Sequence, residues 1–234
     1  MIFLGSLICP ILTLSNSFIR NCILSNKAMD LFEIYDSAIV FLMLLFAPVI
    51  MSVIAVFLIV REYTEKTWKT IFVVPVSRIQ ILAGKFIMLF FLIMFFMILS
   101  WAEILVFTIL CSFLFEISGI TWMTALFFLF RMIKGGVLLY PVITPFLYLA
   151  LRTKGGLVPF IVIAGVVLVN IVLSSTFVAR FYPWLLPHRL LYWSMYKKTG
   201  QAGGSIAVGI WIVGLLFMLS AVGGIWQIWT EDID

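Results

Sequence analysis

The side chains that could do chemistry fall into two groups along the chain. The first is a charged and polar stretch over residues 61–85, which lies between two long apolar runs. The second consists of single charges inside apolar runs, namely Glu103, Arg131 and Lys134. A charged stretch of this kind can dock on another protein, whereas an isolated charge in an apolar run needs an opposite charge or a polar ligand as its partner.

Neither group resembles a catalytic centre. The sequence contains no G-x(4)-G-K-[ST] phosphate-binding motif, no H-E-x-x-H and no G-x-S-x-G, so we expect no enzyme and no ATP-binding site in this chain. A single Glu103 and the one histidine, His188, do not form an acid–base set. The three cysteines are scattered without metal-ligand spacing, which predicts no metal site and no cofactor: Cys9, Cys22 and Cys111.

The composition indicates which solvent surrounds these residues. The chain has 234 residues, of which 65% are hydrophobic and 11% charged, and its mean hydropathy is +1.25. Soluble domains carry about 25% charged and 45–50% apolar residues. The sequence therefore predicts an integral membrane protein, and the long apolar runs without period-2 alternation predict helices rather than barrel strands. The net charge of +5 is spread over the loops and does not indicate nucleic-acid binding.

We predict an all-α integral membrane fold with six transmembrane helices in one membrane domain, residues 1–234. A crossing takes about 20 helical residues. The predicted spans are residues 1–19, 37–60, 82–114, 120–151, 156–178 and 204–229. The first contains Pro10 and is short, so a cleaved signal peptide is its alternative. Because it lacks a basic n-region and a small-residue cleavage site, we expect a first span that could continue upstream of Met1.

Six spans place both termini on one side of the membrane. Seven basic residues lie on the side that holds residues 61–85, and six lie on the other side. The positive-inside rule therefore barely favours a cytoplasmic location for residues 61–85. The seven are Arg61, Lys66, Lys69, Arg78, Lys85, Arg152 and Lys154.

The connector between the second and third spans, residues 61–80, is predicted to be a rigid projecting elbow. Glu65 and Lys69 can pair at i,i+4, which favours a short helix over 61–73, and Pro75 then breaks it. Ser77 and Gln80 fit a capping box, which predicts a helix from Arg78 to about Phe113. At 1.5 Å per residue this helix would be about 54 Å long, so its first turns should protrude into water.

This stretch resembles a known family. It reads E-x(4)-T-W-K-x(5)-P-x-S-R-x(5)-G-K from Glu62 to Lys85. The pattern resembles type-2 ABC transporter permeases related to bacitracin-resistance and lantibiotic-immunity permease subunits, and it covers about 25 residues closely. In that family the connector includes the coupling helix that docks on the ATPase. The resemblance implies that the coupling residues are Glu62, Thr67, Trp68, Lys69, Pro75, Ser77 and Arg78.

The resemblance also implies partners and a location. We expect two copies of a separate ABC ATPase, which would bind ATP and Mg, and a second permease copy in a homodimer or heterodimer. The complex would lie in the bacterial cytoplasmic membrane and export, or give immunity against, an amphipathic peptide antibiotic. Residues 180–198 resemble the family's re-entrant or interfacial segment between spans five and six, and the aromatic side chains of this segment suit a membrane interface.

Three other functions stay open. The chain could be a permease for a lipid or another small amphiphile, or a non-transporting membrane scaffold or sensor. It could also be an enzyme that acts on lipid head groups through Glu103 or His188. An ATPase partner would separate the transporter from the scaffold and the enzyme.

The intramembrane charges are predicted to pair. If spans three and four form a hairpin that turns near residues 117–118, Glu103 lies level with Arg131. We therefore predict a Glu103–Arg131 ion pair, extended by Lys134. The pair could fix the packing of two helices, or the cluster could line a substrate path or bind an anionic group such as a lipid phosphate. Pro141 and Pro145 predict a bend in the fourth span.

Overall fold

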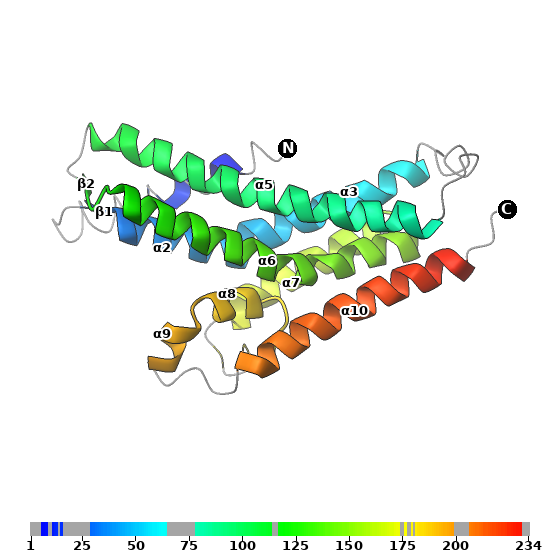
Figure 1. The fold of residues 1–234 in the computed structure, drawn as a ribbon. Helices are drawn as coiled ribbons and strands as arrows, with labels where there is room; N and C mark the ends of the chain where they lie inside the picture. Colours follow the sequence, from blue (N-terminus) through cyan, green and yellow to red (C-terminus); the bar gives the residue numbers. More distant parts are fainter. Residues whose placement is uncertain are drawn as a thin grey trace.

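The fold was analysed in a computed structural model of the chain. It describes residues 6–8, 11–13, 15, 29–64, 78–113, 117–173, 176, 179, 181–198 and 206–230. Long helices lie side by side along one axis, and α10 crosses them obliquely (Figure 1). The long helices are α2 (Leu31–Phe41) with η2 (Leu42–Phe46) and α3 (Ala47–Thr64), α5 (Arg78–Ser112), α6 (Trp122–Thr153), α7 (Leu157–Leu173) and α10 (Ile206–Thr230).

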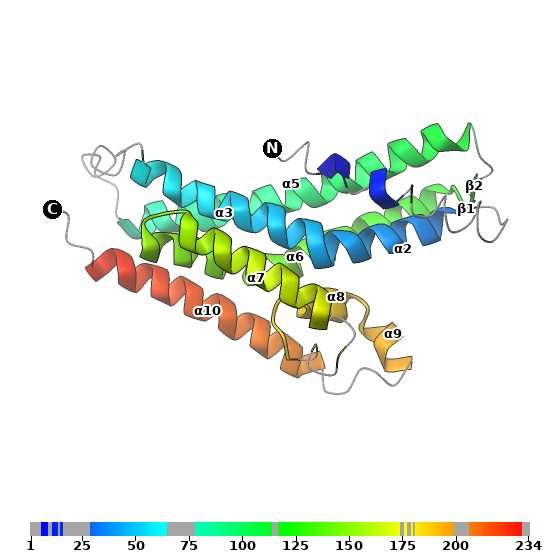
Figure 2. The same cartoon turned by 180° about the vertical axis from the view of Figure 1, so that it is seen from behind.

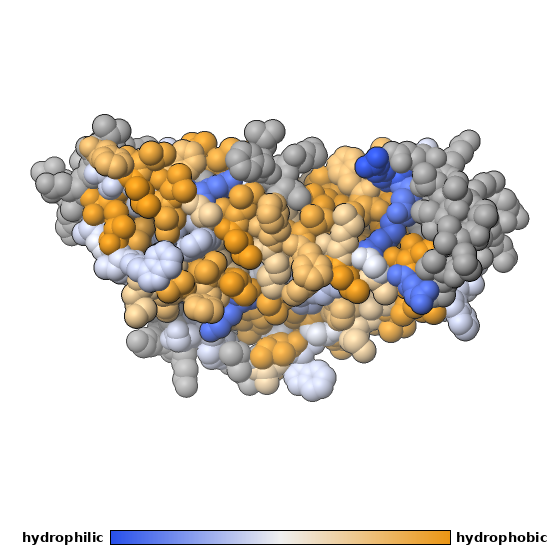
Figure 3. All heavy atoms as spheres, turned by 45° about the horizontal axis from the view of Figure 1, so that its top comes forward, coloured by the Kyte–Doolittle hydropathy of each residue, from blue (hydrophilic) through white to orange (hydrophobic). Residues whose placement is uncertain are grey.

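Four of the described helices are long and apolar enough to cross a membrane. They are Leu31–Thr64, Ile79–Ser112, Trp122–Thr153 and Ala207–Gln227, and Leu157–Asn170 is a shorter apolar helix. These correspond to five of the six predicted spans. The predicted span 1–19 lies mostly outside the described residues, so the count of six stays a prediction. Apolar side chains cover the middle of the visible face, and hydrophilic ones gather towards one end (Figure 3).

The two ends of the bundle differ. At one end, called here the connector end, lie the last residues of α3, α6 and α10 and the first residues of α5 and α7 (Figure 1). At the other, the strand end, β1 (Met29–Asp30) pairs in parallel with β2 (Ile117–Ser118). Gly119 follows β2 with φ of 77°, and a Cβ there would lie 2.5 Å from Asp30 Oδ1. Only glycine therefore suits this turn.

The α2–η2–α3 helix begins earlier than predicted. Asp30 is its N-cap, and its side chain accepts a hydrogen bond from the Phe32 N–H at 3.4 Å. The helix therefore starts at Leu31 instead of residue 37, and Asp36 lies inside it rather than in a loop. Residues Leu42–Phe46 form a π-helical turn between α2 and α3.

The other boundaries lie close to the predicted ones. The helix predicted from Arg78 to about Phe113 is α5, Arg78–Ser112. The fourth span is α6, which starts at the N-cap Thr121 with a reciprocal Thr124 capping box. Beyond Thr64 the elbow, including its predicted coupling helix, lies outside the described residues until Arg78.

The prolines in α6 do not interrupt the helix. Pro145 has no N–H to give to the carbonyl of Pro141, four residues earlier. The Thr144 hydroxyl donates to this carbonyl instead, at 2.9 Å. Thr144 also shares a hydrogen bond with Ser220 of α10 at 2.9 Å. The position of the missing backbone hydrogen bond in α6 is thus also a contact between α6 and α10.

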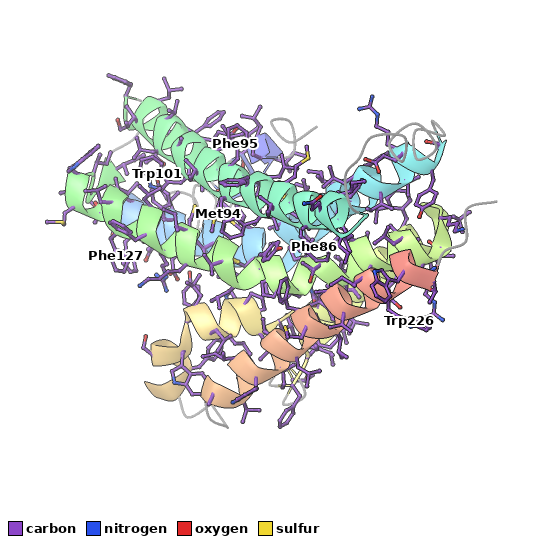
Figure 4. All side chains as sticks on the ribbon, turned by 45° about the vertical axis from the view of Figure 1, so that its right-hand side comes forward. Phe86, Met94, Phe95, Trp101, Phe127 and Trp226 are labelled. Carbon is purple, nitrogen blue, oxygen red and sulfur yellow. The ribbon has the colours of Figure 1, made fainter. Side chains whose placement is uncertain are left out.

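Helix α6 is the centre of the bundle and packs against α3, α5 and α10. Gly135 faces Met43 and Leu191, and Gly136 faces Met97 and Met94. Without side chains at these positions, the neighbouring helices can approach closely, as small residues allow in membranes. Figure 4 shows Met94 between α5 and α6. Seen from behind, α7 lies along α3 and the back of α6 (Figure 2).

The segment between α7 and α10 contains two short helices, α8 (Leu186–Leu191) and α9 (Trp193–Lys198). They lie beside α6 towards the strand end (Figure 1). Pro187 sits in the first turn of α8, where its missing N–H costs nothing. The predicted interfacial segment 180–198 thus contains two short helices among its described residues.

Candidate functional site

The last turns of α3 and the first turns of α5, called here the roots of the elbow, are joined by an ion pair whose lysine is buried. Lys85 Nζ of α5 lies 2.6 Å from Glu62 Oε2 of α3. The same ammonium group donates to the carbonyl oxygen of Leu58 at 2.7 Å. Lys85 is only 7% exposed, so the charge is held between the helices rather than in solvent. The last turns of α3 are thereby fixed to the beginning of α5.

Glu62 was predicted as a residue that contacts an ATPase, and the structure gives it a partner within the chain. The other predicted coupling residues are not placed. Thr67, Trp68, Lys69, Pro75 and Ser77 lie outside the described residues, and Arg78 is described only as the first residue of α5. Lys85, the last residue of the sequence pattern, is thus the one whose side chain joins the two roots.

The predicted Glu103–Arg131 ion pair is wrong. Arg131 Nη1 lies 3.1 Å from Asp36 Oδ1 of α2. Glu103 and Arg131 were predicted to pair because they lie at a similar depth along their helices. The partner of Arg131 is decided instead by the side of α6 on which it lies. Gly136 faces α5, and Arg131, five residues earlier, points about 140° away from that side at 100° per residue. Arg131 therefore meets α2, whose Asp36 the sequence analysis had placed in a loop.

Tyr192, at the end of α8, completes this contact. Its hydroxyl donates to Asp36 Oδ1 at 2.9 Å. The guanidinium carbon of Arg131 lies 3.9 Å from the centroid of the Tyr192 ring, which is the geometry of a cation–π contact. One carboxylate thus accepts two hydrogen bonds, and the three side chains join α2, α6 and the α8 segment.

Glu103 has a different environment on α5. It is 8% exposed, and its Oε1 accepts a hydrogen bond from the Ser6 hydroxyl at 2.8 Å. Its Oε2 has no hydrogen-bond partner among the described residues. The carboxyl group therefore attaches the N-terminal segment to α5 and takes no part in the Arg131 contact.

Lys134 does not extend the Arg131 pair either. It is exposed on α6, and within the described part of the chain no carboxylate pairs with it. The three predicted intramembrane charges thus have three separate environments.

His188 lies beside the Arg131 contact. Its ring stacks on Tyr192, with the ring centroids 4.8 Å apart, and it is 7% exposed. Burial, assisted by the nearby Arg131 and Arg189, lowers the pKa of His188 to about 4. The imidazole is therefore neutral at physiological pH, and its Nε2 has no hydrogen-bond partner among the described residues.

The described residues contain no group of three or more His, Cys, Asp or Glu side chains that could hold a metal ion. The two ion pairs found among the described residues join helices at two levels. One, Glu62 with Lys85, lies at the connector end, and the other, Asp36 with Arg131 and Tyr192, lies in the half towards the strand end. Both ion pairs fix long apolar helices to one another, as expected in a multi-pass membrane protein.

Comparisons with known proteins show the family of the chain. A protein family described as "ABC-2 family transporter protein" matches residues 1–172. The chain is also similar to the "Bacitracin transport permease protein BCRB" of Bacillus licheniformis, with 27% identity over 153 residues, which is 65% of this chain and 71% of that protein. No solved structure matches. Since the family match covers well over half of the sequence, the chain belongs to the ABC-2 family of transporter proteins.

Proposed function

We propose that the chain is the permease subunit of an ATP-driven exporter, and that residues 61–80 contain a coupling helix that docks on a separate ABC ATPase. Membership of the ABC-2 family supports a permease that works with such an ATPase. The observation that supports the coupling role is the ion pair that joins the two roots of the elbow. Glu62 and Lys85 hold the ends of α3 and α5 together on either side of the connector.

Helix length supports a projecting connector. Helix α5 has 35 residues, which at 1.5 Å each is about 52 Å, well beyond a hydrocarbon core of about 30 Å. Its excess length and the last turns of α3 can reach out of the membrane. A push on the connector would then act on two helices that move as one.

The assembly follows from the same proposal. Two ATPase copies would supply ATP and Mg binding, and a second permease copy, identical or not, would complete the substrate path. The elbow and both termini would lie in the cytoplasm of a bacterium. The four long helices, α7 and residues 1–19 would make six spans.

An amphipathic peptide antibiotic is the proposed substrate, and similarity to a bacitracin transport permease protein supports it. A lipid or another small amphiphile is the second candidate. An enzyme acting on lipid head groups is less well supported, because Glu103 bonds to Ser6 whereas His188 stacks on Tyr192. A scaffold or sensor would need no ATPase.

Co-purification tests the coupling role. The tagged permease is co-expressed in its native bacterium and purified in mild detergent as wild type and as Trp68→Ala with Arg78→Glu. We expect an ABC ATPase with the wild type and its loss with the double variant. Arg152→Glu is the matched control, because Arg152 is exposed at the same end of the bundle but outside the elbow. If wild type brings down no ATPase, or if Arg152→Glu loses it equally, the proposed docking surface is wrong.

Antibiotic sensitivity tests the substrate. The permease and its ATPase, expressed together in a sensitive bacterium, should raise the bacitracin concentration that stops growth. The same pair with a hydrolysis-deficient ATPase should not. An intact, ATP-hydrolysing complex that gives no protection would exclude bacitracin and favour another amphiphile.

A further inference from the structure

Lys134 is a charged side chain on the outer surface of a membrane-spanning helix. It lies twelve residues after Trp122, so it is about 18 Å along a helix of about 48 Å. This places it within about 6 Å of the middle of α6, on the strand-end side. A lysine at the centre of a membrane helix costs about 2.5–3.5 kcal/mol by insertion scales, and such residues mark functional sites. No carboxylate of the described residues pairs with Lys134, so none of these residues offsets the cost.

Arg131, one turn nearer the strand end, has unused donors. A guanidinium group carries five N–H donors. Only Nη1 makes a hydrogen bond with a described residue, the one to Asp36. Because the guanidinium rests on the Tyr192 ring, its plane is fixed and its other donors are held in place. A fixed fork of this kind suits the paired oxygens of a phosphate or carboxylate.

Both cations lie on the flank of α6 that faces α8. Gly135 faces Leu191 of α8, whereas Gly136 faces Met94 and Met97 of α5. Because successive residues are rotated by 100° around the helix, Lys134 lies on the side of Gly135 that faces away from α5. Asp36 pairs with Arg131, and among the described residues no carboxylate pairs with Lys134, so the two cations of α6 have one acidic partner between them.

Apolar side chains surround the charges. Phe127, Phe130 and Val137 are 53%, 61% and 49% exposed and lie on the same outer side of α6 as Lys134. Phe127 projects outward from α6 in Figure 4. A ligand bound here would thus meet cations at one point and apolar surface around it, which matches an amphiphile with an anionic head.

From this arrangement we propose that the α6–α8 flank, at Arg131 and Lys134, binds the phosphate of an anionic lipid in the leaflet at the strand end. Lys134 extends along α6 towards the interface, as long basic side chains do near membrane surfaces. Arg131, one turn nearer the strand end, provides the contact closer to the head group. The acyl chains lie against Phe127, Phe130 and Val137. This site does not depend on the proposed ATPase coupling.

Native mass spectrometry of the purified permease tests the site. Binding of phosphatidylglycerol and of phosphatidylcholine is titrated against wild type, Lys134→Gln and Lys134→Arg. We expect Lys134→Gln to weaken the tightest phosphatidylglycerol site about tenfold, the scale of one charge-assisted hydrogen bond. Lys134→Arg should retain the affinity, and the phosphatidylcholine affinity should be the same in all three. Val106→Gln is the matched control, since Val106 is 52% exposed on α5, away from the proposed site, and the change adds an amide without removing a charge.

Three outcomes would overturn the proposal. Equal phosphatidylglycerol affinity in wild type and Lys134→Gln would remove Lys134 from any lipid site. Displacement of the lipid by millimolar inorganic phosphate would point to a soluble anion instead. Loss of a permease dimer in Lys134→Gln, with lipid binding unchanged, would mean that a second copy covers this flank. Equal thermal stability of all variants checks that each is folded.

Discussion

Removing Glu62 alone from the Glu62–Lys85 pair should be at least as harmful as removing both partners. In Glu62→Gln, the Lys85 ammonium stays buried and loses its carboxylate partner, while the hydrogen bond to the Leu58 carbonyl remains. In Lys85→Met, Glu62 can turn to water, because its side chain is 26% exposed. Breaking a fully buried pair costs about 3–5 kcal/mol, and an exposed pair contributes about 0.2–1 kcal/mol.

The partial exposure of Glu62 places this pair between those limits. We expect Glu62→Gln to lower the free energy of unfolding by about 2–3 kcal/mol and Lys85→Met by about 1 kcal/mol. The double variant should be no worse than Glu62→Gln, which means a coupling energy of at least about 1 kcal/mol. Unfolding in mixed detergent micelles measures all four proteins. Arg152→Gln, an exposed cation at the same end, is the control and should change stability by less than about 0.5 kcal/mol.

The same variants test the coupling role. In proteoliposomes that contain the partner ATPase, Lys85→Met should keep ATP hydrolysis but move less substrate per ATP than wild type. The reversed pair, Glu62→Lys with Lys85→Glu, restores the attraction and should recover part of the coupling. Additive stability effects, or wild-type coupling in Lys85→Met, would refute the idea that this pair fixes the elbow roots.

Three further predictions concern the strand-end half. Tyr192→Phe removes the 2.9 Å hydrogen bond to Asp36 and should cost about 1–2 kcal/mol in the same unfolding assay, since the acceptor is charged. His188 binds a proton less readily in the folded protein than in the unfolded chain. The free energy of unfolding should therefore decrease as the pH falls from 6.5 towards 4. The loss is about 2 kcal/mol at pH 5, and it should vanish in His188→Gln. Gly119→Ala should lower the thermal midpoint, because φ is 77° there and the new Cβ would press on Asp30, whereas an equal midpoint would contradict the turn geometry.

The helices could be predicted from the sequence because their length follows from lipid thickness and their ends from local chemistry. The Ser77–Gln80 pattern predicted the start of α5 at Arg78, where the structure has it. The start of α2 had a similar signal that was overlooked. Asp30 followed three residues later by Glu33 is an acidic capping pattern before an apolar run, and Asp30 is indeed the N-cap.

Partners of charged residues were harder to predict. Position along a helix can be counted in residues, but the direction of a side chain depends on how each helix is rotated in the bundle. Arg131 lies on the α2 and α8 side of α6, and Tyr192 comes from a segment 156 residues away from Asp36 in sequence. Loop composition cannot specify such a contact. The predicted pairing therefore failed for Glu103, which is buried and bonded to Ser6 instead.

The helix from Leu31 to Thr64 takes part in both polar contacts. Asp36 binds Arg131 and Tyr192 near its beginning, and Glu62 binds Lys85 near its end, about 39 Å away at 1.5 Å per residue. In lipid, apolar burial does little to hold helices together, so such polar contacts have a large share in fixing their positions. Between them lies the π-helical turn Leu42–Phe46, a type of distortion that is frequent at functional sites. A displacement at the elbow can therefore be transmitted in two ways. The helix can move as a rigid unit and strain the Asp36 contact, or it can bend at this turn and leave Asp36 in place. Tyr192→Phe separates them, because it weakens only the contact that the first route must strain.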